Sequence, residues 1–123
     1  MEILSSRILL RPSDYPRSVV FYRDALGPAI AREYPGGTVF FAGGSLIELA
    51  GHGQPASFSG ALWLQVRDVY ATQDELRARG VAIAREARRE PWGLHEMHLT
   101  DPDGVTLIFV GVPEDHPLRR DSR

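Results

Sequence analysis

The chain has 123 residues, 43% of them hydrophobic and 24% charged, which suits one compact domain or two very small repeats that share a core. The net charge of −2, without a long run of one sign, excludes a nucleic-acid surface, and the absence of cysteine excludes disulfides, thiolate metal sites and a cysteine nucleophile. The N-terminus lacks a signal segment and no apolar run approaches the roughly 18 residues of a membrane span, so we expect a soluble, cytoplasmic protein. The charged clusters at 85–90 and 119–123 are interpreted as solvated edges.

The first half of the chain predicts the element order β-α-β-β-β. A strand over residues 3–10 precedes a helix that begins at the N-cap Asp14 and ends at Gly27, with Val19, Tyr22 and Leu26 on one face. Three more strands are then expected, separated by paired glycines, over residues 29–34, 38–42 and 46–50.

The second half repeats this order. A strand over 61–66 leads to a helix from Asp68 to Gly80. The strands that follow are expected over residues 81–87, 94–100 and 105–110, the last two joined by the turn Asp101-Pro-Asp-Gly104.

The two halves also match in their closing strands, because Gly44–Gly51 aligns with Gly104–Gly111 at a constant offset. We therefore expect modules 3–50 and 60–111 in a single domain over 1–112, followed by a loose tail over 112–123. An α+β sandwich whose halves are similar by accident is the alternative, and the paired caps and closing strands argue against it.

Two motifs carry a resemblance to a known family. Ser18-x-x-Phe21-Tyr22-Arg23-Asp24-x-Leu26-Gly27, and the later pair Pro91-Trp92-Gly93 and Asp101–Gly104, resemble the signatures of the vicinal oxygen chelate superfamily of glyoxalases, bleomycin-resistance proteins and extradiol dioxygenases. The resemblance implies an α+β fold in which two β-α-β-β-β modules form a cupped mixed sheet with the helices on the outside. Such a fold hosts several chemistries, so it does not fix the reaction.

In that family's enzymes the first and fourth strands of each module supply His, Glu or Gln ligands to a divalent metal. The corresponding positions here are Arg7, Glu48, Ala61 and Ile108. Alanine and isoleucine donate nothing and arginine cannot deprotonate in a protein, so Glu48 alone is competent. We therefore expect no metal and no cofactor, and a closest similarity to the metal-free, drug-binding branch of the superfamily.

Strand alternation predicts which side chains line the cup. The two-residue turn Gly43-Gly44 should place Val39 opposite Glu48, and the Asp101–Gly104 turn should place His98 opposite Ile108. An ion pair between Arg7 and Glu48 is also expected. The predicted ligand-binding residues are Arg7, Val39, Phe41, Glu48, Trp63, Gln65, Trp92, Glu96, His98 and Ile108.

Several of these residues have a second interpretation. Glu48, Glu96 and His98 could gather around an unconventional metal, or hydrogen-bond a ligand or one another. Trp63 could be a packing residue between subunits and Trp92 an anchor for its loop. His52, His95 and His116 are interpreted as surface histidines.

The favoured functional hypothesis is a non-enzymatic protein that sequesters an antibiotic or another small aromatic natural product, as bleomycin-resistance proteins do. Trp92-Gly-Leu-His-Glu96 is similar to the Trp-Gly-x-x-Glu run of that branch, and Trp63 and Trp92 would stack on the ligand. The alternative is a glyoxalase-like lyase, isomerase or dioxygenase acting on a small carbonyl or aromatic substrate, with His98 or Glu96 as general base and Arg7 stabilising negative charge. A third hypothesis is an interaction module that binds no ligand.

The family resemblance also implies a homodimer with ligand-binding sites near the subunit interface.

Overall fold

The computed structural model describes residues 1–118, so the expectation for Arg119–Arg123 lies outside the described residues. The chain divides into two compact units. The first unit contains Met1–Ser59 and the short segment Asp101–Val105, and the second contains Gly60–Thr100 and the chain from Thr106 onward.

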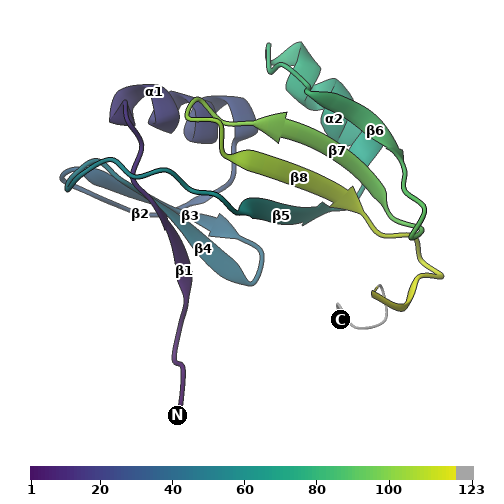
Figure 1. Ribbon diagram of the computed structural model, residues 1–123, viewed down its shortest axis with the longest axis horizontal. Helices are drawn as coiled ribbons and strands as arrows, with labels where there is room; N and C mark the ends of the chain where they lie inside the picture. Colours follow the sequence, from purple (N-terminus) through teal and green to yellow (C-terminus); the bar gives the residue numbers. More distant parts are fainter. Residues whose placement is uncertain (119–123) are drawn as a thin grey trace. The chain divides into compact units, whose positions relative to one another are not determined.

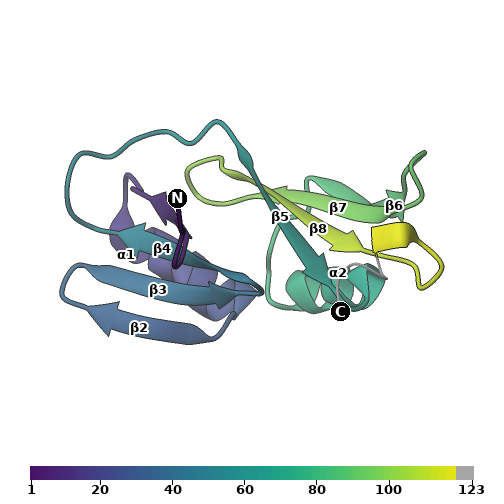
Figure 2. The same ribbon diagram turned by 90° about the horizontal axis from the view of Figure 1, so that it is seen from below.

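The first unit is built on a four-stranded sheet with the strand order β1-β4-β3-β2 (Figures 1 and 2). Its strands are β1 (Arg7–Leu10), β2 (Ile30–Tyr34), β3 (Gly37–Ala42) and β4 (Ser45–Ala50). β1 pairs in parallel with β4, and the other pairs are antiparallel.

The second unit repeats this sheet, with the order β5-β8-β7-β6. Its strands are β5 (Ala61–Val66), β6 (Arg85–Arg89), β7 (His95–Thr100) and β8 (Thr106–Gly111). β5 and β8 are parallel, whereas β7 is antiparallel to both of its neighbours. The α+β class and the two β-α-β-β-β modules are thereby confirmed, with a mixed sheet in each.

Each module has its helix after the first strand. α1 (Tyr15–Val19) continues without interruption into a π-helical segment, η1 (Val20–Leu26), which ends at Gly27 with φ 78°. α2 (Val69–Ala78) begins at Asp68, whose carboxylate accepts hydrogen bonds from the amides of Tyr70 and Ala71. The predicted helix ends are confirmed, because an acidic N-cap satisfies free amides and glycine tolerates the left-handed C-terminal conformation.

Each unit has its own buried core on one face of its sheet. In the first unit Tyr22 from η1 packs against Phe40 from β3, with a ring-centroid separation of 6.2 Å. In the second unit Met97, Leu99 and Leu107 are fully buried, and α2 contacts β6, β7 and β8. Burial does not alternate strictly along the central strands, because four consecutive residues of β3 and four of β4 are buried. The opposite face of each sheet, which carries the polar residues of interest, is therefore partly buried as well.

Two predicted strands are shorter than expected. β1 begins at Arg7 rather than at residue 3, and β6 begins at Arg85 rather than at Val81. The amide of Val81 instead donates to the carbonyl of Leu76 and closes the end of α2, which takes this residue out of the strand. None of the helices in the described part of the chain is long and apolar enough to cross a membrane.

Candidate functional site

In the first unit, the predicted registers place the expected residues in rows across the sheet face opposite Phe40. Val39 lies opposite Glu48, and Phe41 lies opposite Leu46. On the other side of β4, Leu46 pairs with Arg7. Phe41 is 53% exposed, whereas Val39 and Glu48 are buried. The register that was predicted from the Gly43-Gly44 turn is confirmed.

Glu48 is the centre of a polar cluster on this face. Its Oε1 accepts a hydrogen bond from Arg7 Nη1 at 2.7 Å, which confirms the predicted ion pair. Its Oε2 accepts a hydrogen bond from the hydroxyl of Tyr34, and His52 Nε2 lies 3.5 Å from that hydroxyl. The hydrogen bonds from Tyr34 and Arg7 outweigh burial and hold the pKa of Glu48 below its ordinary value. Glu48 is therefore an ionised carboxylate with both oxygens engaged.

Tyr34 was not identified from the sequence, although a signal was present. Tyr34 pairs with Gly37, and its ring occupies the space where a side chain at that position would begin. An ideal Cβ on Gly37 would lie 2.0 Å from Cζ of the ring. The glycine that was interpreted only as part of a turn is thus also required for the approach of the tyrosine to Glu48.

The residues at the four positions implied by the family resemblance do not fit a metal. The guanidinium of Arg7 occupies the neighbourhood of the single competent ligand, and Glu48 already has a partner on each oxygen. Ala61 and Ile108 have no donor atom.

In the second unit, the predicted residues form two rows across the sheet. Trp63, Ile108 and His98 lie side by side on β5, β8 and β7, and Gln65, Val110 and Glu96 form the next row. Trp63 is 48% exposed, while Glu96 is buried and His98 is half-buried. The pairings of His98 with Ile108 and of Glu96 with Val110 are confirmed.

Glu96 and His98 belong to a larger group of side chains that we call the β6–β7 cluster, consisting of Arg85, Glu90, Glu96 and His98. Glu96 Oε1 lies 3.5 Å from His98 Nε2, and Glu96 Oε2 accepts a hydrogen bond from Trp92 Nε1 at 2.8 Å. Arg85 Nη2 lies 3.0 Å from His98 Nε2 and also contacts Glu90 Oε1. A carboxylate, an imidazole and a guanidinium are thus in direct contact.

The interpretation of residues 85–90 as a solvated edge is wrong at two positions. Glu90 is only 6% exposed and the side chain of Arg85 only 24%. The cause is a β-bulge, since β6 has one extra residue between Arg85 and Arg88 relative to β7. Arg85 then lies opposite His98 and Arg88 opposite Glu96, so both arginines share the face of the cluster.

Glu90 is held ionised by two neighbouring arginines. Burial raises its pKa, but the hydrogen bond and charge of Arg85, together with Arg88, outweigh burial and lower the pKa below its ordinary value. Arg88 Nε lies 3.5 Å from Glu90 Oε1. Glu90 therefore holds the guanidinium of Arg85 in place beside His98.

Glu90, Glu96 and His98 could provide three metal ligands, because one donor atom from each lies within 4.8 Å of the others. Arg85, however, contacts both Glu90 and His98 Nε2. A cation at this point would have to displace the guanidinium and would be repelled by its charge. The alternative metal site of Glu48, Glu96 and His98 does not fit a metal either, because both carboxylate oxygens of Glu48 already accept hydrogen bonds.

The remaining aromatic and histidine side chains are mostly at the surface. Trp92 is 58% exposed although its indole N–H is held by Glu96, which agrees with the alternative role of a loop anchor. His95 Nδ1 lies 2.7 Å from the hydroxyl of Tyr70, and His116 Nε2 lies 3.3 Å from the carbonyl of Trp92. His95 and His116 are half-buried and His52 is exposed.

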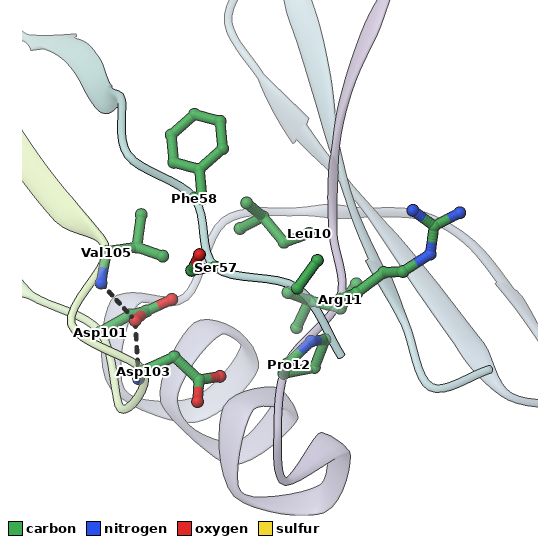
Figure 3. A pocket seen from close by; sticks show the side chains of 10 residues that line it. Leu10, Arg11, Pro12, Ser57, Phe58, Asp101, Asp103 and Val105 are labelled. Atoms are coloured by element: carbon green, nitrogen blue, oxygen red, sulfur yellow. Dashed lines mark hydrogen bonds between the residues drawn. The ribbon is translucent and has the colours of Figure 1, made fainter. Parts of the chain in front are cut away.

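A separate, open hollow lies in the first unit (Figure 3). It is lined by the end of β1, by residues 56–58 and by the turn at 101–105. In Figure 3 the guanidinium of Arg11 points away from Asp101 and Asp103, and Asp101 accepts hydrogen bonds from the amides of Asp103 and Val105. None of the predicted ligand-binding residues lines this hollow.

Comparison with known proteins gives consistent results. The family model "Glyoxalase/Bleomycin resistance protein/Dioxygenase superfamily" matches residues 5–109. The chain is 31% identical to the probable lactoylglutathione lyase of Vibrio parahaemolyticus, covering 83% of this chain and 86% of that protein. It is 30% identical to the lactoylglutathione lyase of Haemophilus influenzae, covering 89% and 92%. A lactoylglutathione lyase structure from Agrobacterium tumefaciens shares the fold, with a TM-score of 0.72 and 18% identity over 90% of this chain and 95% of the other.

The favoured functional hypothesis from the sequence, a non-enzymatic sequestration protein, was wrong. We expected a non-enzymatic drug-binding protein, whereas several curated relatives that match most of the chain are named as lactoylglutathione lyases, which are enzymes. The hypothesis gave the missing metal ligands too much weight, because side chains outside those positions can also carry out proton transfer. The enzymatic alternative is the better supported of the two.

Proposed function

Because the chain belongs to the Glyoxalase/Bleomycin resistance protein/Dioxygenase superfamily, we propose that it is a glyoxalase-type enzyme, a lyase or isomerase, that moves a proton on a small carbonyl or thioester substrate. The observation that carries the proposal is the set of relatives named lactoylglutathione lyase, which are 29% to 31% identical over 83% to 89% of this chain.

The chemistry in that name requires proton transfer. Lactoylglutathione is a thioester of a 2-hydroxy acid, and its cleavage without water must give a 2-oxoaldehyde and a thiol. The proton on the hydroxyl-bearing carbon leaves to a base and returns to the thioester carbon, and the hydroxyl proton passes from one oxygen to the other. The carbon–sulfur bond of the resulting hemithioacetal then breaks, and its hydroxyl proton ends on sulfur. Such a sequence needs a base beside carbon and a hydrogen-bond donor for the oxygen that becomes negative.

The β6–β7 cluster has groups of both kinds. The carboxylate of Glu96 and the imidazole of His98 lie 3.5 Å apart on neighbouring positions of one face of β7. Trp63 and Ile108 extend the row of His98 as an apolar surface on which the carbon skeleton of a substrate can rest.

The proposal also includes features that follow from the family resemblance. We propose that residues 1–112 act as one domain in a cytoplasmic homodimer with substrate sites near the subunit interface. We further propose that side chains perform the chemistry without a metal at positions 7, 48, 61 and 108, since these four residues do not form a donor set.

Turnover of the thioester tests the proposed function. The purified protein is incubated with lactoylglutathione, and separately with 2-oxopropanal and glutathione, while thioester absorbance is followed. We expect turnover that Glu96→Gln lowers by about 100-fold or more, because loss of a general base typically costs 10²–10⁴ in rate. Asp74→Asn on α2 is the matched control, since this exposed carboxylate lies outside the cluster.

No turnover in either direction by a folded wild-type protein, with or without added divalent metal ions, would overturn the proposal. Turnover that survives in Glu96→Gln and His98→Gln alike would overturn the assignment to the β6–β7 cluster.

A further inference from the structure

We propose that Arg85 is a positioning residue that fixes His98 as the neutral Nδ1–H tautomer, so that His98 donates a hydrogen bond to the substrate oxygen while Glu96 acts as the base. The inference rests on the proposed function, and it separates the roles of two side chains that the sequence left interchangeable.

The contact between Arg85 and His98 fixes which imidazole nitrogen accepts. A guanidinium carries only N–H donors and has no acceptor. Arg85 Nη2 lies 3.0 Å from His98 Nε2, so Nε2 must be the acceptor in this contact. A neutral imidazole whose Nε2 is an acceptor has its hydrogen on Nδ1.

Glu90 and the bulge in β6 keep the guanidinium of Arg85 beside His98. Glu90 is buried and ionised, and its Oε1 contacts Arg85 Nη2. The bulge in β6 sets Arg85 directly opposite His98, and the amide of bulged Ala87 is bound by Gln73 Oε1 at 2.5 Å. The contact with His98 is therefore built into the strand pairing and does not depend on a freely moving surface side chain.

A hydrogen on His98 Nε2 would face an N–H group of Arg85, so two donors would be in contact without an acceptor between them. Glu96 Oε1 is an acceptor that lies 3.5 Å from Nε2. Arg85 thus disfavours the Nε2–H tautomer, and Glu96 is the acceptor available to an Nε2–H group if Arg85 is removed.

One atom of His98 and one of Glu96 remain available to a substrate. Within residues 1–118, His98 Nδ1 has no hydrogen-bond partner, and the side chain is 34% exposed. Glu96 Oε2 is held by Trp92, which leaves Oε1 beside the imidazole. A 2-hydroxyacyl thioester fits these two groups when its carbonyl oxygen accepts a hydrogen bond from His98 Nδ1–H and the neighbouring carbon lies near Glu96 Oε1. The donor then stabilises the negative charge on the oxygen while the carboxylate takes the proton from the carbon.

Nitrogen-15 NMR of the histidine side chains tests the tautomer directly, without substrate. At a pH where imidazoles are neutral, we expect His98 to show a protonated Nδ1 and an unprotonated Nε2, with its signals identified by their loss in His98→Gln. In Arg85→Met we expect a shift toward Nε2–H, and Arg85→Lys, which restores a cationic donor, should recover part of the Nδ1–H form. His95, whose Nδ1 contacts Tyr70, is an internal reference that should not change.

Steady-state kinetics of thioester turnover by the same variants provide a second test. We expect Arg85→Met to lower kcat about tenfold or more with a smaller change in KM, as for an interaction made mainly in the transition state, and Arg85→Lys to regain part of it. Arg89→Met is the matched control, because it removes an equal charge from β6 opposite His95.

The outcomes separate this inference from the proposed function. His98 with Nε2 protonated in the wild type, or a tautomer unchanged in Arg85→Met, overturns the inference whatever the activity. The expected tautomer in a protein without thioester turnover supports the contact between Arg85 and His98 and overturns the proposed function. Turnover together with the expected shift and partial rescue by lysine supports both.

Discussion

Glu48 shows how a buried carboxylate can keep its charge through its neighbours. Its oxygens accept hydrogen bonds from Arg7 and Tyr34, so a guanidinium and a phenol provide the compensation that a buried carboxylate needs. The side chain of Glu48 is 12% exposed and that of Arg7 is 43% exposed, so solvent weakens the ion pair from one side. The hydrogen bond from Tyr34 is the larger cause of the lowered pKa, ahead of the one from Arg7.

This arrangement predicts how stability responds to acid. The folded pKa of Glu48 lies below its ordinary value of 4.5, so its contribution to stability is present above that pH and is lost as the pH falls through the folded value. Urea unfolding measured between about pH 2 and pH 7 should show a smaller acid loss in Glu48→Gln than in the wild type, with Tyr34→Phe between them. Glu90 and Asp24 also have lowered pKa values, so the difference between the proteins isolates Glu48. Parallel acid profiles for the wild type and Glu48→Gln would contradict the prediction.

At the scale of elements, turn length decides which registers the sequence can predict. The pairs Val39 with Glu48 and His98 with Ile108 followed from short turns, because turn length and type fix the pairing of the strands that they join. β6 could not be predicted in this way, since Arg85-Glu-Ala-Arg-Arg89 alternates poorly and its bulge depends on Gln73, a residue of α2. Glu90 and Arg85 were consequently assigned to the surface, and the cluster around His98 was only half identified.

The bulge in β6 gives a prediction about α2. Gln73 is buried and its Oε1 accepts the hydrogen bond of the Ala87 amide, so Gln73→Met should leave that amide without a partner and destabilise the protein by about 1–3 kcal/mol. Gln73→Glu retains an acceptor oxygen at the same place and should keep more of the stability. The midpoints of urea unfolding measure both effects.

The same substitution should also affect His98. Because the bulge sets the position of Arg85, Gln73→Met should shift the tautomer of His98 toward the Nε2–H form, as expected for Arg85→Met. Equal stability in Gln73→Met and the wild type would show that the contact is not needed.

At the scale of the whole molecule, the internal repeat predicted two modules with the same strand order, and the structure has them. It did not predict that Asp101–Val105, the turn between β7 and β8, groups with the first unit. Repeat patterns describe local order, whereas this grouping comes from contacts between residues far apart in the chain. The hydroxyl of Tyr22 donates a hydrogen bond to Asp101 Oδ2 at 2.9 Å, and Ser13 contacts Asp103.

The bond between Tyr22 and Asp101 should therefore contribute to the stability of the whole chain. Tyr22 is 1% exposed, and Tyr22→Phe removes the donor to Asp101 Oδ2 while the amides of Asp103 and Val105 still bind Oδ1. We expect a loss of about 1–3 kcal/mol in the free energy of unfolding, whereas Tyr70→Phe, which removes an exposed hydroxyl, should change it by less than about 0.5 kcal/mol.

The same pair predicts a response to alkali. Burial, and then the charge of Asp101, raise the pKa of Tyr22 above its ordinary value of 10.0, so the folded state favours the neutral phenol. That stability is fully present below the ordinary value and is lost as the pH rises above it, because the unfolded chain then ionises more readily. Unfolding measured between about pH 8 and pH 11 should show a steeper alkaline loss in the wild type than in Tyr22→Phe. Identical alkaline slopes, or equal effects of Tyr22→Phe and Tyr70→Phe at neutral pH, would mean that the contact of Tyr22 with the 101–105 turn adds nothing to the stability of the chain.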